Sequence, residues 1–434
     1  MKAYGAYKPA CLSSLGAIPV HWDEERIKTV FVESDIRSAT GDEEMLSVSH
    51  ITGITPRSQK NVNMFLAESN VGQKICSPGD IVINTMWAWM AALGVSTYGG
   101  IVSPSYGVYK PYISKYNSQY LDYLLRTEYY RAEYVRRSTG INSSRLRLYP
   151  DRFLDMRFVC PPIEEQNQIV RYLNWKVSQI NRLINAKRRQ IGLLQECLRK
   201  SIDDIMTNTE WRKARLKDVA VIYTGNSISD KSKYQSAGEA YPYISSKDIS
   251  LGTGVVDYDN GMYTPFSEID FRIAPTNSVL LCIEGGSAGK KVAIVDREVS
   301  FVNKLCCFNT MHFNPQFLYF YMKSSQFFSE FKKNMTGLIG GVSKAALRQT
   351  SIPFPEIEAQ ALAVEDIDVK YRSIQNVISE ITKKISLLHE YRTRLISDVV
   401  TGKIDVRGVA VPEHEAVEEN TGEMDEIDLM ESEV

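Results

Sequence analysis

Residues 367–407 read IDVKYRSIQNVISEITKKISLLHEYRTRLISDVVTGKIDVR. Apolar side chains recur here at alternating intervals of four and three residues, and Arg392 is the one polar member of the series. The series is Ile367, Tyr371, Ile374, Ile378, Ile381, Ile385, Leu388, Arg392, Leu395 and Val399. This spacing predicts the heptad seam of a coiled coil. A stripe so narrow on a charged helix cannot bury itself, so it needs a partner helix with a similar stripe.

A matching stripe lies in the middle of the chain, where Lys187 fills its one gap. Its members are Ile169, Leu173, Val177, Ile180, Ile184, Ile191, Leu194, Leu198 and Ile202. Both stretches begin with proline, acidic residues and glutamine, at 162–166 and 355–360, which is typical of a helix start. We therefore predict two long helices that pair within one chain. The predicted seam includes Ile180, Ile184, Leu194 and Leu198 of the first helix and Ile374, Ile378, Ile381, Ile385 and Leu388 of the second.

The chain also contains an internal repeat, in which each copy shows mixed α and β patterning and then a long helix. The matching residues are Trp22, Arg26 and Lys28 with Trp211, Arg215 and Lys217, and Thr139-Gly140 with Thr336-Gly337. The repeat predicts a globular domain at 1–160, a long helix at 161–208, a second globular domain at 209–353, a second long helix with a closing motif at 354–407, and a disordered acidic tail at 408–434.

The two helices are expected to pack antiparallel. The end of the first helix then lies beside the start of the second, and the second domain can bridge them. A compact domain of this size has a radius of gyration of only roughly 15 Å, too small to span a parallel pair. The predicted fold class is α+β, with two mixed α/β domains at opposite ends of an intramolecular antiparallel two-helix coiled coil and approximate two-fold symmetry. Residues 401–407 are expected to fold back near the first domain.

The charge of the chain is divided unevenly. The 434 residues carry 51 Lys and Arg against 52 Asp and Glu, but ten of the acidic residues lie in the tail, so residues 1–407 carry a net charge of +9. A basic body permits a nucleic-acid partner without proving one. The sequence shows neither an apolar run of roughly 20 residues nor a signal-peptide layout, which predicts a cytoplasmic protein with no membrane partner. Seven scattered cysteines predict reduced thiols rather than disulfides or a zinc site.

The motifs of nucleic-acid enzymes are missing from the sequence. The stretch from Glu284 to Lys291 only superficially resembles a phosphate-binding loop, because Glu284 replaces its first glycine and Lys291 replaces its final hydroxyl residue. It also lies between two strand patterns rather than before a helix. The five histidines show no metal-ligand spacing. We predict no catalytic residue and no metal site in this chain.

The order of domain, long helix, domain and long helix resembles the DNA-specificity subunit of type I restriction-modification systems. The Trp-x-x-x-Arg-Ile/Leu-Lys openings, the Thr-Gly turns and the proline-to-glutamine helix starts agree with it, and the closing LISDVVTGKIDVR at 395–407 is the most specific match. The resemblance covers residues 1–407. It implies two target-recognition domains, each reading one half of a bipartite, asymmetric site on double-stranded DNA. The helices would act as a spacer and as the dock for two methyltransferase subunits, which restriction and translocation subunits would join.

This resemblance implies a non-catalytic subunit without a cofactor of its own, since S-adenosylmethionine, ATP and Mg²⁺ would be bound by the partner subunits. Base edges are read mainly by Arg, Asn and Gln, and phosphates by Lys and Arg. The candidate DNA contacts are Asn84, Trp87, Trp89, Arg136, Arg137, Thr139, Asn142, Ser143 and Arg145 in the first domain, and Ser287, Lys290, Lys291, Lys344 and Arg348 in the second. Each one, taken singly, fits a solvated surface charge or a loop-fixing residue equally well.

A second class of function stays open at the level of sequence. A basic body with a coiled coil is also typical of a stand-alone DNA-binding regulator or a coiled-coil scaffold that works without methyltransferase partners. Binding of specific DNA without a methyltransferase favours the regulator, and co-purification with methyltransferase subunits favours the assembly.

Overall fold

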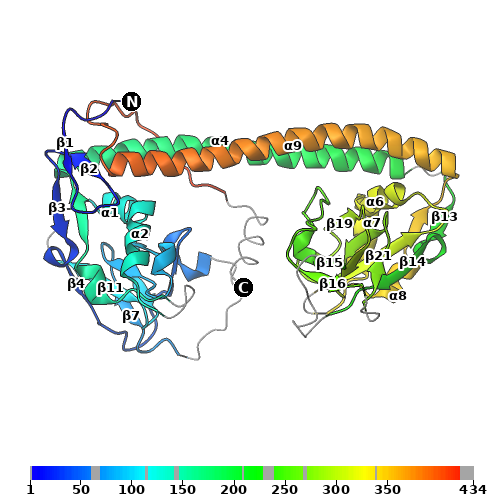
Figure 1. Ribbon diagram of the computed structural model, residues 1–434, viewed down its shortest axis with the longest axis horizontal. Helices are drawn as coiled ribbons and strands as arrows, with labels where there is room; N and C mark the ends of the chain where they lie inside the picture. The colour runs from blue at the N-terminus through cyan, green and yellow to red at the C-terminus, as the bar shows by residue number, and fades with distance from the viewer. Residues whose placement is uncertain are drawn as a thin grey trace. The chain divides into compact units, whose positions relative to one another are not determined.

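The chain folds into two compact units, shown in Figure 1, a ribbon of the computed structural model. The structure describes residues 2–59, 69–112, 116–140, 146–207, 210–227, 239–266, 271–337 and 340–420. Unit 1 comprises Met1–Ile184 and Ile385–Glu419, and unit 2 comprises Asn185–Lys384 and Asn420–Val434. Each unit therefore contains one globular domain and one half of each long helix, α4 (Ile163–Met206) and α9 (Ile357–Val400).

Each unit is built around a four-stranded antiparallel sheet with the same strand order. In unit 1 the order is β4 (Phe31–Glu33), β11 (Gly107–Pro111), β8 (Ile81–Ile83) and β9 (Leu93–Val95). In unit 2 it is β14 (Ala220–Thr224), β21 (Leu305–Thr310), β18 (Val279–Cys282) and β19 (Val292–Ile294). In both sheets the second and third strands of the chain form a hairpin, and the fourth inserts beside the first. The sequence repeat is thus a repeat of topology.

Alternating side chains of the central strands pack on the two faces of each sheet. Ile81 and Ile83 of β8 share a core with α1 (Ser118–Leu125) and α2 (Glu128–Arg137), whereas Val82 packs on the opposite face. In unit 2, Val279 and Leu281 share a core with α6 (Pro315–Met322) and α7 (Ser325–Lys333), and Leu280 packs on the opposite face. Each sheet is therefore covered on both sides.

Smaller elements complete the two domains. Unit 1 adds the two-stranded ladders β1 (Tyr7–Pro9) with β2 (Ala17–Pro19), β3 (Asp23–Arg26) with β12 (Arg157–Cys160), β5 (Leu46–Ser49) with β6 (Gly53–Pro56), and β7 (Lys74–Cys76) with β10 (Gly100–Val102), and also α3 (Pro150–Leu154). Unit 2 adds a sheet in the order β16 (Tyr263–Pro265), β15 (Ala240–Ile244), β20 (Val299–Phe301) and β17 (Ile273–Ala274), the ladder β13 (Lys213–Arg215) with β22 (Ser351–Pro353), and the helices α5 (Leu216–Val219) and α8 (Lys344–Gln349).

The long helices pair in an antiparallel sense within each unit. In unit 1, Ile169 and Ile184 of α4 share a core with Leu395 and Val399 near the end of α9. In unit 2, Leu198 and Ile202 near the end of α4 share a core with residues near the start of α9, such as Ile367. Of the predicted seam, Ile180, Ile184, Leu198, Ile378 and Ile381 are buried, and Leu194, Ile374, Ile385 and Leu388 are half-buried. The fold class is α+β, with two long paired helices, as the sequence predicts.

One glutamine at each helix start explains the repeated proline-to-glutamine motif. Gln166 accepts a hydrogen bond from the backbone N–H of Asn117 at 3.0 Å and donates to the Pro161 carbonyl at 2.8 Å. Gln360 makes the equivalent bonds to Asn314 at 2.9 Å and Pro355 at 2.9 Å. Because Asn117 and Asn314 are the N-caps of α1 and α6, each glutamine ties a long helix to the first helix of its domain.

The closing motif returns to the N-terminal part of unit 1, which confirms that prediction. Lys2 forms a β-bridge with Asp405, and the Tyr7 hydroxyl donates to the Gly402 carbonyl at 3.2 Å. Gly402 has a φ of +78°, and a Cβ there would lie 2.4 Å from Cδ of Pro19. The turn after α9 therefore requires glycine for its backbone conformation and for its close approach to Pro19.

The acidic tail differs from the expectation of disorder over residues 408–420. There it runs as an extended segment that forms hydrogen bonds with side chains of α4. For example, Asn181 Nδ2 donates to the Val417 carbonyl at 2.8 Å. The sequence could not indicate this, because the partners lie more than 230 residues earlier. Residues 421–434 lie outside the described part of the chain.

No helix among the described residues is both long and apolar enough to pass through a membrane. All seven cysteines are free thiols; Cys11 and Cys197 are exposed, and the other five are buried.

Candidate nucleic-acid interface

The predicted DNA contacts lie on equivalent loops of the two units. In unit 1 they occupy the turn between β8 and β9, around η3 (Ala88–Met90), the end of α2, and the segment after it. In unit 2 they occupy the turn between β18 and β19, and α8. β8 and β18 hold the same place in their sheets, so the turns that follow them are equivalent positions of the fold.

The two candidate segments of unit 1 contact each other. Thr139, after α2, forms an isolated β-bridge with Arg147. The next residue, Leu148, donates its backbone N–H to the Thr85 carbonyl at 3.0 Å, and Arg147 Nε donates to Thr85 Oγ1 at 3.4 Å. The turn after β8 and the segment after α2 therefore form one continuous surface. Asn142, Ser143 and Arg145 lie outside the described residues.

The candidate segments of unit 2 are joined in the same way. Gly341 bridges both Glu284, at the start of the turn after β18, and Thr336, after α7. The backbone N–H of Gly285 donates to the Gly340 carbonyl at 3.0 Å. The bridge leads directly into α8, whose N-cap Ser343 accepts from the Ala346 N–H at 3.2 Å. Lys344 and Arg348 are therefore held beside the turn after β18, on a capped helix.

Two of the candidates point inward and shape their loops. Asn84 is buried, donates from Nδ2 to the Tyr106 hydroxyl at 3.2 Å, and accepts from the Met86 N–H at 3.3 Å. Lys291 is only 4% exposed, and its ammonium donates to the Ser246 carbonyl at 2.9 Å. Their burial corrects the assignment of both as DNA-facing residues, because a side chain that is bonded inside the domain cannot also reach a base edge.

The remaining candidates in unit 1 differ in how far they reach solvent. Trp87 is exposed, whereas Trp89 is half-buried and donates from Nε1 to the Met86 carbonyl at 3.1 Å. Arg136 and Arg137 both bind the buried carboxylate of Glu133, at 2.6 Å and 3.1 Å. Burial disfavours the ionised form of Glu133, but the hydrogen bonds from the two arginines outweigh it and hold the pKa of that carboxyl below its usual value.

The Glu133 pairing orients the end of α2. The side chain of Arg136 stays 64% exposed and that of Arg137 is 23% exposed, so Arg136 offers its guanidinium to a ligand while one edge is held by Glu133. A fixed guanidinium loses less side-chain entropy on binding a phosphate or a guanine. Thr139 is exposed beside it.

Of the unit 2 candidates, Lys290, Lys344 and Arg348 are exposed, and Ser287 is half-buried in the turn, where its carbonyl accepts from the Lys290 N–H at 3.0 Å. Sequence reasoning missed Lys304. It is exposed, and its carbonyl accepts from the Ile283 N–H at 2.9 Å, which places it beside the turn after β18. Only the pairing of β18 with β21 brings it there, and no local signal marks that pairing.

Arg147 was also missed, although a local signal was available, since it follows the candidate Arg145 by two residues. Among the described residues there is no group of three or more His, Cys, Asp and Glu placed to hold a metal ion. The arrangement offers backbone N–H groups, hydroxyls and cationic side chains on exposed turns. Those groups suit recognition of phosphates and base edges.

Comparison with known proteins also points to a nucleic-acid interface. Residues 208–386 match the family described as the type I restriction modification DNA specificity domain. A curated relative, the type I restriction enzyme MjaVIII specificity subunit of Methanocaldococcus jannaschii, is 22% identical over 289 residues, which is 59% of this chain and 64% of the relative. The match thus spans less than two thirds of that relative's length.

A solved structure shares the fold. A chain from work on complex assembly and conformational transition of the type I R-M system is 14% identical, has a TM-score of 0.61, and matches over 89% of this chain and 99% of its own length. The HsdS subunit of Thermoanaerobacter tengcongensis is 15% identical with a TM-score of 0.41, over 92% of this chain and 100% of that subunit. The comparisons thus identify a type I restriction modification DNA specificity domain at residues 208–386, and the first of these solved chains shares the fold over 89% of this chain.

Proposed function

We propose that this chain is the non-catalytic DNA-recognition subunit of a type I restriction-modification complex. Each of its two domains reads one half of a bipartite, asymmetric site on double-stranded DNA. The paired helices set the distance between the half-sites and dock two methyltransferase subunits, which are joined by restriction and translocation subunits. S-adenosylmethionine, ATP and Mg²⁺ belong to those partners.

The observation that carries the proposal is the equivalence of the two candidate loops. In both units the turn between the second and third strands of the sheet is bonded to the segment that follows the second domain helix. Beside these bonded segments unit 1 exposes Trp87 and Arg136, and unit 2 exposes Lys290, Lys344 and Arg348. Two copies of one recognition surface that differ in side chains suit two half-sites of different sequence. On the equivalent turns, for example, unit 1 exposes Trp87 and unit 2 exposes Lys290.

An exposed apolar stripe on α9 supports docking of a protein partner. Leu362, Val369 and Val377 are 68%, 67% and 43% exposed within unit 2. Their spacings of seven and eight residues place them on one face of the helix, away from the seam. A row of exposed apolar side chains on a helix is typical of a protein-binding surface. A methyltransferase subunit that covers this row is the partner we expect.

The deciding experiment maps methylated adenines in a genome with and without this chain, in cells that hold the methyltransferase subunits. We expect methylation at one bipartite motif, two short specified sequences separated by a fixed unspecified gap, and its complete loss when the chain is deleted. Unchanged methylation with retained binding of purified chain to specific DNA would instead favour a stand-alone regulator. Replacing Val377 by Asp should weaken binding of the methyltransferase and leave DNA binding intact.

A further inference from the structure

The extended segment after the closing motif is bound to the outer face of α4. Within unit 1, the backbone N–H of Val417 donates to Ser178 Oγ at 3.3 Å, and the Val417 carbonyl accepts from Asn181 Nδ2 at 2.8 Å. Ser178 and Asn181 are each only 6% exposed. Two buried polar side chains of α4 therefore form hydrogen bonds with both the N–H and the carbonyl of one tail residue, so this contact is specific.

Glu419 adds a charged anchor two residues further on. Its carboxylate lies 2.5 Å from Arg392 Nη1 and 3.1 Å from His389 Nε2, and its side chain is 11% exposed. Arg392 also donates to Asn181 Oδ1 at 2.7 Å. Arg392 is the one polar member of the α9 seam, so the tail carboxylate supplies the counter-charge of the residue that interrupts the heptads. Within unit 2, Asn420 continues the contact by donating its N–H to Asn185 Oδ1 at 2.9 Å.

A second anchor holds the beginning of the segment. Gln168 Nε2 of α4 donates to the carbonyls of Val406 at 3.0 Å and Val409 at 2.7 Å. The tail is thus attached to α4 at Gln168 and again, about ten residues further along the helix, at Ser178 and Asn181. It runs in the same direction as α4 between these points.

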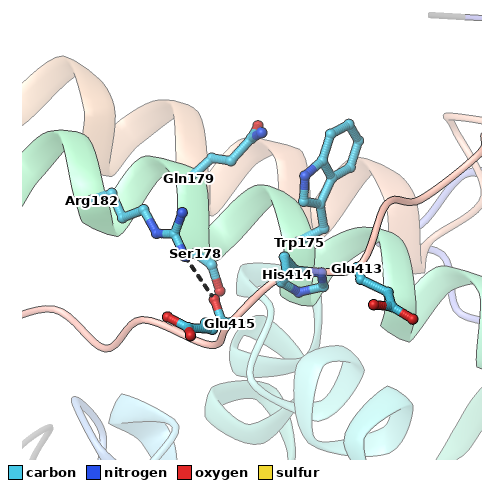
Figure 2. Close-up of a pocket in the computed structure, with 7 residues that line it drawn as sticks. All are labelled: Trp175, Ser178, Gln179, Arg182, Glu413, His414 and Glu415. Atoms are coloured by element: carbon cyan, nitrogen blue, oxygen red, sulfur yellow. Dashed lines mark hydrogen bonds between the residues drawn. The ribbon is translucent and has the colours of Figure 1, made fainter.

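Between the anchors the segment stands off the helix, as Figure 2 shows. A pocket of about 590 Å³ lies between Trp175, Ser178, Gln179 and Arg182 on one side and Glu413, His414 and Glu415 on the other. Arg182 crosses it to donate to the Glu415 carbonyl at 3.3 Å. Residues 412–416 are exposed, so this middle part buries little surface of its own. A segment held at its two ends and exposed between them can dissociate from α4 without unfolding of the helix or of the domain.

We propose that residues 409–420 form an intramolecular strap that covers the polar face of α4 and restricts access of a partner subunit to that face until it is displaced. The face is defined by Ser178, Asn181, Arg182 and Trp175. The regulatory part of this proposal rests on the proposed docking of methyltransferase subunits to the long helices. The strap itself rests only on the contacts given above.

Cross-linking in the full chain tests the strap. A photo-reactive amino acid at position 417 keeps the two backbone hydrogen bonds, since neither uses the Val417 side chain. We expect cross-links to the α4 peptide that contains Ser178 and Asn181. A mixture of isotopically light and heavy chains separates cross-links within one chain from those between copies. Cross-links that fall elsewhere, or only between copies, would overturn the strap.

Binding of methyltransferase subunits tests its role. We compare the full chain, a chain that ends at Pro412 and so keeps the Gln168 anchor, and the single variants Glu419→Gln and Glu413→Gln. Truncation at Pro412 and Glu419→Gln each release the strap. Glu413→Gln removes the same charge at an exposed position and serves as the matched control. If the strap is closed nine-tenths of the time, its release tightens binding about tenfold.

The outcomes separate the two proposals. The proposed role of the strap is supported if the truncated chain and Glu419→Gln bind the methyltransferase more tightly than the parent chain while Glu413→Gln binds it equally. Equal binding by all four chains overturns it. Failure of every chain to bind the methyltransferase, with specific DNA still bound, contradicts the proposed docking instead, and the cross-linking result then decides the strap alone.

Discussion

At the scale of the single residue, Lys323 is a side chain whose charge state is altered by the fold. It follows α6 in unit 2 and donates to the Gly252 carbonyl and to the Tyr371 hydroxyl, the latter at 3.2 Å. Tyr371 belongs to α9 and donates to the Thr253 carbonyl at 2.8 Å. This group of residues joins a domain loop to the long helix, and burial of the ammonium lowers the pKa of Lys323 to about 7.

The lowered pKa predicts a pH dependence of stability. Between pH 7 and the ordinary lysine value near 10.4, the unfolded chain holds a proton at Lys323 that the folded chain has lost, so unfolding takes up a proton. The free energy of unfolding therefore rises with pH in this window, by up to about 1.4 kcal/mol per pH unit from this one group. Lys323→Met should remove that part of the slope, as measured by urea unfolding at pH 7.5 and 9.5.

The matched control is Lys332→Met, on the exposed side of α7. It should keep the parent slope, because the change leaves Lys323 and its contacts in place. A slope equal to the parent's in Lys323→Met as well would show that the ammonium keeps its proton through its contacts with the Tyr319 and Tyr371 rings, at 4.7 Å and 5.2 Å.

At the scale of the element, the long helices combine a buried seam with two quite different outer faces. α9 exposes Leu362, Val369 and Val377 in unit 2, whereas the outer face of α4 in unit 1 is polar and carries residues 409–420. Local periodicity accounts for the seam, because heptad spacing acts within a few turns. The outer faces depend on which segment or partner lies against them.

Helix length makes a prediction about the DNA site. Seven residues added to each helix, between Lys187 and Leu194 in α4 and between Ile378 and Ile385 in α9, keep the heptad register of both. The addition lengthens the pair by about 10 Å at 1.5 Å per residue, or roughly three base pairs at a rise of 3.4 Å. The unspecified gap in the methylated motif should grow by about that number, with both half-sites unchanged. Mapping of methylated adenines measures it, and an unchanged gap would show that the helices do not act as the spacer.

At the scale of the whole molecule, the chain is two copies of one design. Each copy has the same sheet order, the same Asn N-cap tied by a helix-start glutamine, and the same pair of bonded loops. The copies differ in the side chains of those loops, in the smaller sheets that complete each domain, and in the return of residues 401–407 to unit 1. Such a design allows one recognition surface to change without disturbing the other.

Domain exchange tests this independence. Under the proposed function, replacing residues 211–353 by the corresponding domain of a type I specificity subunit should change one half-site of the methylated motif and leave the other half and the gap as they are. Replacing residues 1–160 should do the converse. Methylome mapping of each hybrid checks the outcome, and a change in both halves after one exchange would contradict separate recognition.

The loops show where prediction from sequence failed. The sequence suggested the turn after β8, the end of α2, the turn after β18 and α8 as candidate DNA contacts, but Asn84 and Lys291 turn inward and Lys304 was not among the candidates. Lys291 is bound by a carbonyl 45 residues away, and Lys304 is brought to the turn by the β18–β21 ladder. Residue type suggests which groups suit DNA, but only long-range packing decides which of them point toward solvent.

The sequence by itself determined the two long helices, their antiparallel pairing, the duplication and the α+β class, because heptad spacing, helix-start residues and repeat offsets are encoded locally along the chain. The tertiary structure alone decided the orientation of the loop side chains, the glycine-dependent turn at Gly402 against Pro19, and the course of residues 408–420 along α4. Each of these depends on contacts between residues far apart in the chain, whose energies are individually small and leave no local periodicity to read.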